Sequence, residues 1–203
     1  MIINPDPDPS IHISKSFIDV CIDTECCHNW RLVAAKELKA GEKLASHKIG
    51  SQLLCPNART IKIFIQDDSL EKEIVIDRYA IPMDASCIPK LIELPWCFMN
   101  HSCEPNTYDQ WQYCDNSKRV SSRLVIKQDI QQGEELTIDY CLEQYQYPTP
   151  FRCFCNSRLC RKNVFGFVAL ASSEKHQLLR SVSPFVQQRY AKAVNQFPTT
   201  EFS

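Results

Sequence analysis

Three cysteines near the end of the chain have a spacing that indicates metal chemistry. Cys153, Cys155 and Cys160 lie in FRCFCNSRLC and have the spacing C-x-C-x4-C. Thiolates this close in sequence can face one zinc ion if the chain turns tightly, and a structural zinc site uses four ligands in a tetrahedron. The spacing therefore predicts a zinc site whose fourth ligand comes from elsewhere in the fold. The alternative is three buried thiols that bind no metal.

Two central segments concentrate polar groups that are candidates for a functional site. Residues 100–106 read NHSCEPN and follow the apolar run LPWCFM, and residues 133–140 read GEELTIDY. Taken singly, the first segment indicates a turn-rich loop, and the second indicates a turn that leads into a strand. Neither segment identifies a reaction by itself.

Taken in this order, and followed by the three cysteines, the two segments closely resemble the SET-domain lysine methyltransferases that carry a post-SET zinc segment. NHSCEPN matches the family motif NHSCxPN, GEELTIDY matches GEELTxDY, and FRCFCNSRLCRKNV is similar to post-SET. The resemblance runs from Phe17 to Phe167. It implies a mainly β fold of small curved sheets with knot-like threading of the two motif segments, a post-SET zinc loop and short C-terminal helices.

The resemblance also implies catalytic and metal-binding residues. Tyr140 matches the catalytic tyrosine, whose hydroxyl would orient the acceptor amine, and Tyr108 is a candidate aromatic residue of the acceptor channel. Cys103 would be the fourth zinc ligand, beside Cys153, Cys155 and Cys160. The implied reaction is methyl transfer from S-adenosylmethionine (SAM) to a lysine of a protein, with histones among the candidate substrates.

The same resemblance implies residues that contact SAM. Asn100 and His101 would contact the cofactor, and Phe154 would pack against its adenine. The family's usual G-x-G pair aligns with residues 29–31, which contain no glycine, so Trp30 and Arg31 are expected to contact SAM through their backbone. This difference keeps open a non-catalytic binding module of the same fold. The absence of a recognisable targeting module keeps open an enzyme that methylates a small molecule.

The surrounding sequence predicts the elements that position these residues. Short β-branched runs predict strands at residues 16–22, 61–65, 73–76 and 123–126. Residues 34–41 fit either a helical turn or a strand and turn. A helix is expected from Ser172, and a second one where Ser183 can cap and Pro184 can begin a helix. The expected organisation is a flexible N-terminus (1–14), a SET domain (15–145), a post-SET zinc segment (146–170) and a C-terminal helical extension (171–203).

Composition excludes several other classes of protein. The 203 residues are 44% hydrophobic and 23% charged, which is typical of a globular domain. A net charge of −1 argues against direct nucleic-acid binding through bulk charge. The four glycines form neither a dinucleotide-binding G-x-G-x-x-G nor a P-loop. Without an apparent signal peptide or membrane span, we expect an intracellular monomer or homodimer, cytoplasmic, or nuclear if its substrate is a histone.

Overall fold

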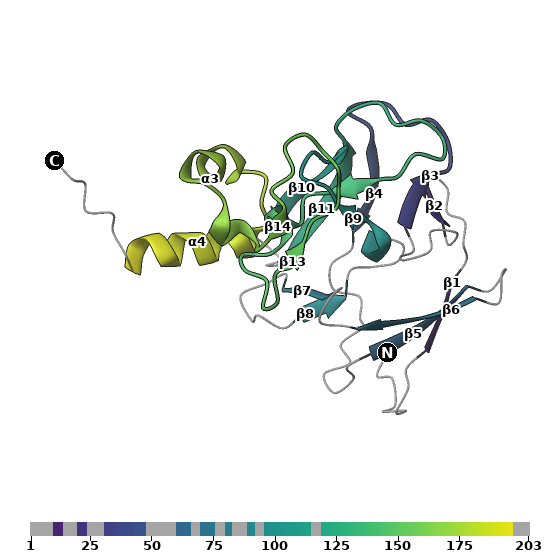
Figure 1. Ribbon diagram of the computed structural model, residues 1–203, viewed down its shortest axis with the longest axis horizontal. Helices are drawn as coiled ribbons and strands as arrows, with labels where there is room; N and C mark the ends of the chain where they lie inside the picture. The colour runs from purple at the N-terminus through teal and green to yellow at the C-terminus, as the bar shows by residue number, and fades with distance from the viewer. Residues whose placement is uncertain are drawn as a thin grey trace.

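The computed structural model describes residues 10–13, 20–23, 31–47, 60–65, 70–75, 80–82, 89–91, 96–114 and 119–196 (Figure 1). Most of its elements are short strands: β1 Ser10–Ile13, β2 Val20–Asp23, β3 Arg31–Ala34, β4 Lys43–His47, β5 Thr60–Ile65, β6 Leu70–Val75, β7 Ala80–Pro82, β8 Pro89–Leu91, β9 Asn100–His101, β10 Thr107–Cys114, β11 Arg119–Ile126, β12 Thr137–Ile138, β13 Phe151–Arg152 and β14 Asn163–Val164. The helices are short: η1 Trp96–Phe98, α2 Tyr140–Glu143, η2 Phe167–Ala169, α3 Ser172–Leu178 and α4 Pro184–Gln196.

The strands form small sheets, two of which have three strands. One has the order β10-β11-β4, and the other has the order β1-β5-β6. In β11, Arg123 is exposed between the buried Ser122 and Leu124, whereas Leu124, Val125 and Ile126 are all buried, so the end of this strand is covered on both faces. Figure 1 shows the sheet β1-β5-β6 at one end of the molecule and helices α3 and α4 at the other.

Residues 34–41 form a strand and turn, so the helical alternative for this segment is wrong. The backbone of Leu38 exchanges two hydrogen bonds with Ile130, each 2.9 Å long, and both side chains are fully buried. The turn ends at Gly41, whose φ of 87° favours glycine. Pairing with a distant segment thus decides the local structure here.

The two motif segments lie side by side although 26 residues separate them in the sequence. Strand β9 pairs in parallel with β12, so that Asn100 lies opposite Thr137. The buried side chain of Asn106 donates to the carbonyl of Glu135 and accepts from the backbone N–H of Thr137, both at 2.8 Å. The β9-β12 pair is only two residues long, and the Asn106 amide supplies further hydrogen bonds between the two segments where the strands have ended.

The C-terminal part of the described chain has a hydrophobic core of its own. This core joins the cysteine segment to helices α3 and α4, and its fully buried members are Val164, Phe167, Val182 and Val186. Ser183 Oγ accepts a hydrogen bond from the backbone N–H of Val186 at 3.2 Å, directly before α4 begins at Pro184. The predicted start of the second helix is therefore confirmed.

The predicted fold class, small β-sheets followed by short C-terminal helices, is confirmed. The strand expected at residues 16–22 is described from Val20 onward, within β2. The first nine residues of the expected flexible N-terminus lie outside the described part of the chain. Within that part, no helix has the length and apolar character needed to cross a membrane.

Candidate functional site

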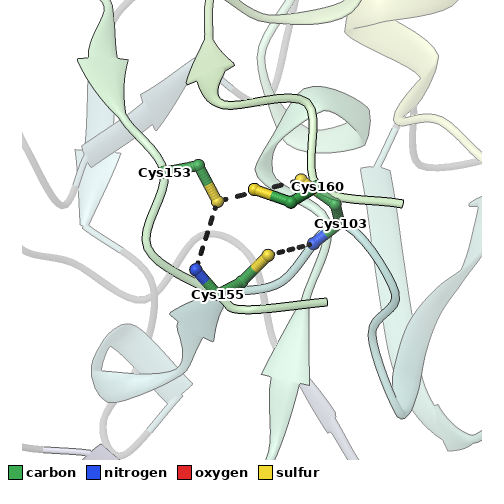
Figure 2. A group of neighbouring side chains, drawn as sticks. All are labelled: Cys103, Cys153, Cys155 and Cys160. Atoms are coloured by element: carbon green, nitrogen blue, oxygen red, sulfur yellow. Dashed lines mark hydrogen bonds between the residues drawn. The ribbon is translucent and has the colours of Figure 1, made fainter. Parts of the chain in front are cut away.

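Four cysteine sulfurs converge where the first motif meets the loop between β13 and β14 (Figure 2). The Sγ atoms of Cys103, Cys153, Cys155 and Cys160 all lie within 4.8 Å of one another. The sulfurs of Cys103 and Cys153 are 3.8 Å apart. A tetrahedral zinc site with Zn–S distances of about 2.3 Å has sulfur–sulfur edges of about 3.8 Å. The cluster therefore fits one metal ion, with Cys103 as the fourth donor.

Backbone N–H groups point at the sulfurs. Arg161 donates to Cys103 Sγ at 3.3 Å, Cys155 to Cys153 Sγ at 3.4 Å, and Cys103 to Cys155 Sγ at 3.5 Å. Burial raises the pKa of Cys155, but the N–H of Cys103 and the Ser157 hydroxyl outweigh burial and lower it to about 6. Burial raises the pKa of Cys103 and Cys153, so the thiolate form that binds metals is favoured at Cys155.

Tyr140 lies in a cluster of aromatic rings beside these cysteines. Its hydroxyl donates a hydrogen bond of 2.7 Å to the carbonyl oxygen of Met99. The centroid of its ring is 5.4 Å from that of His101, 6.1 Å from that of Phe151 and 6.4 Å from that of Tyr147. The Tyr147 hydroxyl donates to the backbone carbonyl of Tyr140 at 3.2 Å. Since the Tyr140 hydrogen points to Met99, the phenol oxygen is oriented to accept hydrogen bonds.

His101 connects the tyrosine to the cysteines. The backbone N–H of Tyr140 donates to Nδ1 of the imidazole at 3.1 Å, so Nδ1 acts as an acceptor. The hydrogen of the neutral ring is then on Nε2, which lies 3.3 Å from Sγ of Cys103. Burial lowers the pKa of His101, which favours this neutral form. The imidazole therefore donates to a sulfur of the cluster.

Asn100 is oriented by Glu135 of the second motif. Nδ2 of Asn100 donates to Oε1 of Glu135 at 2.8 Å, and Oε2 of the same carboxylate lies 3.8 Å from Nη1 of Arg31. Because a carboxylate only accepts, the nitrogen of the Asn100 amide must face it, which leaves Oδ1 available to accept from a ligand. Sequence reasoning missed Glu135, since nothing in the sequence separates it from its neighbour Glu134.

Two other predicted site residues, Tyr108 and Phe154, are described by the structure, and a third lies outside the described part of the chain. Tyr108 lies in β10 opposite Val125 and is 36% exposed. Phe154 follows Cys153 and is 72% exposed, and the guanidinium of Arg152 lies 5.2 Å from its ring centroid. Trp30 lies outside the described residues. The structure thus brings Asn100, His101, Tyr140 and the four cysteines together, and the roles of all the predicted site residues stay predictions.

A family model that matches more than half of this chain identifies its family. Residues 29–141 match the family model described as the SET domain. The chain is 39% identical over 64 residues to the H3 lysine-36 specific histone-lysine N-methyltransferase of Schizosaccharomyces pombe, a match that covers 31% of this chain and 8% of that protein. It is 28% identical over 139 residues to human histone-lysine N-methyltransferase SETD1B, covering 66% and 6%. The chain therefore spans less than a tenth of the length of these curated relatives.

Solved structures are also similar. KRYPTONITE, solved in complex with mCHG DNA and SAH, matches with a TM-score of 0.45 and 19% identity, over 71% of this chain and 28% of that one. A structure solved to explain the product specificity of histone lysine methyltransferases matches with a TM-score of 0.44 and 21% identity, over 70% of this chain and 55% of that one.

Proposed function

Because this chain belongs to the SET-domain family, we propose that it is a protein-lysine methyltransferase that uses SAM as the methyl donor. The observation that carries this proposal is the position of Tyr140. Its hydroxyl hydrogen is engaged by Met99, at 2.7 Å, while its ring is packed among His101, Tyr147 and Phe151. A fixed phenol oxygen that can accept hydrogen bonds is suited to hold an amine and orient its lone pair.

SAM, when bound, supplies a sulfonium methyl group that passes to a neutral amine as the C–S bond breaks and the new N–C bond forms. Tyr140 accepts a hydrogen bond from that amine and limits its orientation, which is how a positioned group lowers the barrier of a two-reactant step. Its oxygen also makes weak CH···O contacts to a polarised methyl group. The aromatic rings around Tyr140 exclude water from the amine.

The cofactor side of the proposed site is built on Asn100. The available Oδ1 of this amide suits an ammonium group, and the carboxylate of Glu135 keeps the amide in that orientation at 2.8 Å. The backbone of Arg31, held near Glu135 by its guanidinium at 3.8 Å, would contact the cofactor together with Trp30 and His101. Phe154, largely exposed, would pack against the adenine.

Zinc would be held by Cys103, Cys153, Cys155 and Cys160, whose sulfurs lie within 4.8 Å of one another. Bound there, zinc would be a structural crosslink between the first motif and the C-terminal loop. We assign residues 15–145 to the SET domain, 146–170 to the post-SET segment and 171–203 to the helical extension. The metal would thereby fix the post-SET segment next to Tyr140.

Histones are the first substrates to test, because the curated relatives are named as histone-lysine methyltransferases. A histone substrate would require this protein to work in the nucleus. The test uses zinc-loaded protein, methyl-labelled SAM, and either purified histones or a cell lysate separated into protein and small-molecule fractions. Label on lysine residues, located by mass spectrometry, is the expected result. Label confined to small molecules, or no label, would contradict the proposal.

A further inference from the structure

One guanidinium joins three parts of the chain. Arg161, directly after the last cysteine of the cluster, donates from Nη1 to Oδ2 of Asp139 at 2.9 Å. Its Nε and Nη2 atoms lie 3.4 and 3.3 Å from Oε1 of Glu174 in helix α3. Its backbone N–H donates to Sγ of Cys103 at 3.3 Å. The post-SET loop, the residue before Tyr140 and the C-terminal extension therefore meet at Arg161.

The Asp139 end of this connection is almost fully buried. The Asp139 side chain is 4% exposed, and its Oδ1 atom accepts from the backbone N–H of Cys141 at 3.0 Å, where it caps the short helix α2 that begins with Tyr140. A buried carboxylate that loses its cationic partner is strongly destabilised. Arg161 therefore stabilises the conformation of the turn that aims Tyr140.

The ion pair between Arg161 and Glu174 is weaker than the ion pair between Arg161 and Asp139. The Glu174 side chain is 41% exposed, whereas that of Arg161 is 21% exposed, so solvent screens this pair more than the Asp139 pair. Oε2 of Glu174 also accepts from the backbone N–H of Ala171 at 3.2 Å, which holds the carboxylate at the start of α3. Helix α3 therefore limits the positions that the guanidinium can take.

We propose that Arg161 is a positioning residue that couples helix α3 to the turn carrying Tyr140, so that the C-terminal extension is a working part of the methyl-transfer site. This inference rests on the proposed function for the role of Tyr140. The coupling itself is a physical property that can be measured without methyl transfer.

The first measurement is hydrogen exchange followed by mass spectrometry on the zinc-loaded full chain, in peptides that cover residues 138–144. Arg161→Gln is expected to raise the exchange rate there at least about tenfold, because a buried carboxylate loses its partner. Glu174→Ala is expected to raise this exchange rate about two- to fivefold, which corresponds to the free energy of a partly exposed ion pair. The Glu174 side chain itself contacts neither a cysteine nor Asp139. Arg161→Lys should fall between the parent and Arg161→Gln.

Two control variants change neighbouring exposed residues. Arg158→Gln alters a cation of the same loop, and Ser173→Ala alters helix α3. Both variants should have the same hydrogen-exchange rate as the parent protein at residues 138–144. If Glu174→Ala changes exchange only within α3, or if its effect equals that of Ser173→Ala, the coupling is overturned.

The second measurement is kinetic, at a temperature where every variant is folded and its zinc content equals that of the parent. Glu174→Ala is expected to lower kcat about two- to fivefold while KM for the acceptor stays unchanged. An unchanged kcat would leave Arg161 with a structural role only and overturn the positioning role. If the parent protein transfers no methyl group, the proposed function fails, and the exchange measurement still decides the coupling.

Discussion

Nε2 of His101 lies 3.3 Å from Sγ of Cys103, and the opposite nitrogen of the same ring accepts from the backbone N–H of Tyr140 at 3.1 Å. One imidazole thus spans the distance between the cysteine cluster and the proposed catalytic tyrosine. Because its two nitrogens have different roles, the tautomer is fixed by these two contacts. A change at the cysteine cluster should therefore alter the position of Tyr140.

The cysteine cluster makes a prediction about zinc binding. Cys160→Ser should lower zinc affinity at least about tenfold, since it removes one of four donors. Cys141→Ala is the matched control, because this buried cysteine is not a member of the cluster and burial raises its pKa to about 12, which keeps it a thiol. Zinc retained after dialysis against a chelator, measured by atomic emission, checks the difference. Equal retention in the two variants would contradict the assigned ligands.

Removal of the metal should also loosen the loop between β13 and β14. Metal binding and folding are linked when the ligands come from distant segments, as with Cys103 and Cys153, which are fifty positions apart in the sequence. The expected result is a lower midpoint of thermal unfolding after chelation, restored when zinc is added back. A midpoint that does not respond to zinc would count against a structural metal.

Glu135 makes a prediction about cofactor affinity. Glu135→Ala removes the acceptor that orients Asn100 and should weaken SAM binding about tenfold, the effect of about 1.4 kcal/mol. Glu134→Ala is the control, because the Glu134 carboxylate accepts only the local Gln131 N–H among its described contacts. Isothermal titration calorimetry with SAM measures both. Equal affinities would show that the orientation of Asn100 does not matter for SAM.

Gly166 makes a prediction about stability. Its φ is 103°, and a Cβ built there would lie 2.8 Å from the carbonyl oxygen of Tyr145. Gly166→Ala should therefore cost about 1–3 kcal/mol for the overlap in addition to the backbone strain. Gly133→Ala is the control: its φ is 82°, but nothing lies within 4 Å of the new Cβ. Urea unfolding should give a clearly larger loss for Gly166→Ala, and equal losses would be contrary to the described packing.

Glu143 makes a prediction about pH. Burial raises its pKa well above the ordinary value, and the carboxylates of Asp109 and Asp139 raise it further. The folded state therefore keeps a proton that the unfolded state releases above pH 4.5, its ordinary pKa, so folding stability falls as pH rises above that value. Glu143→Gln mimics the protonated acid and should remove up to about 1.4 kcal/mol of this loss per pH unit.

The measurement is the free energy of unfolding of Glu143→Gln minus that of the parent, from pH 5 to about pH 8. The difference should increase in favour of Glu143→Gln as pH rises. Asp109, whose pKa is raised to about 6, also makes folding less stable as pH rises. It does so in both proteins, so its contribution largely cancels when the two free energies of unfolding are subtracted. A difference that does not change with pH would mean that Glu143 is ionised in the folded protein.

The local features of the fold and the chemistry of the motifs could be predicted from the sequence. The cap and proline at Ser183 and Pro184 predicted the start of α4 because a helix start is encoded by a few adjacent residues. The short strands β5 and β11 were predicted from their β-branched runs. Residues 34–41 were undecided, because the choice depended on pairing between Leu38 and Ile130, which no local pattern reveals.

The candidate site was predictable only in part, for a similar reason. Spacing alone gave three of the clustered cysteines, and Cys103 came from the resemblance to a family, since the fold brings it across fifty residues of sequence. Glu135 and Arg161 were missed. Each acts through a side-chain contact with another segment, Glu135 with Asn100 and Arg161 with Asp139, and an acidic or basic residue on a loop carries no sign of such a partner.

The central claim is that the hydroxyl of Tyr140 takes part in methyl transfer. The most direct test compares Tyr140→Phe with Tyr190→Phe, whose ring instead packs against Phe167 at 5.5 Å between centroids. Both variants are loaded with zinc and assayed for single-turnover transfer from saturating labelled SAM to the protein acceptor. Tyr140→Phe should be slower by on the order of 10²-fold with SAM affinity unchanged, while Tyr190→Phe should match the parent. Equal rates in the two variants would contradict the claim.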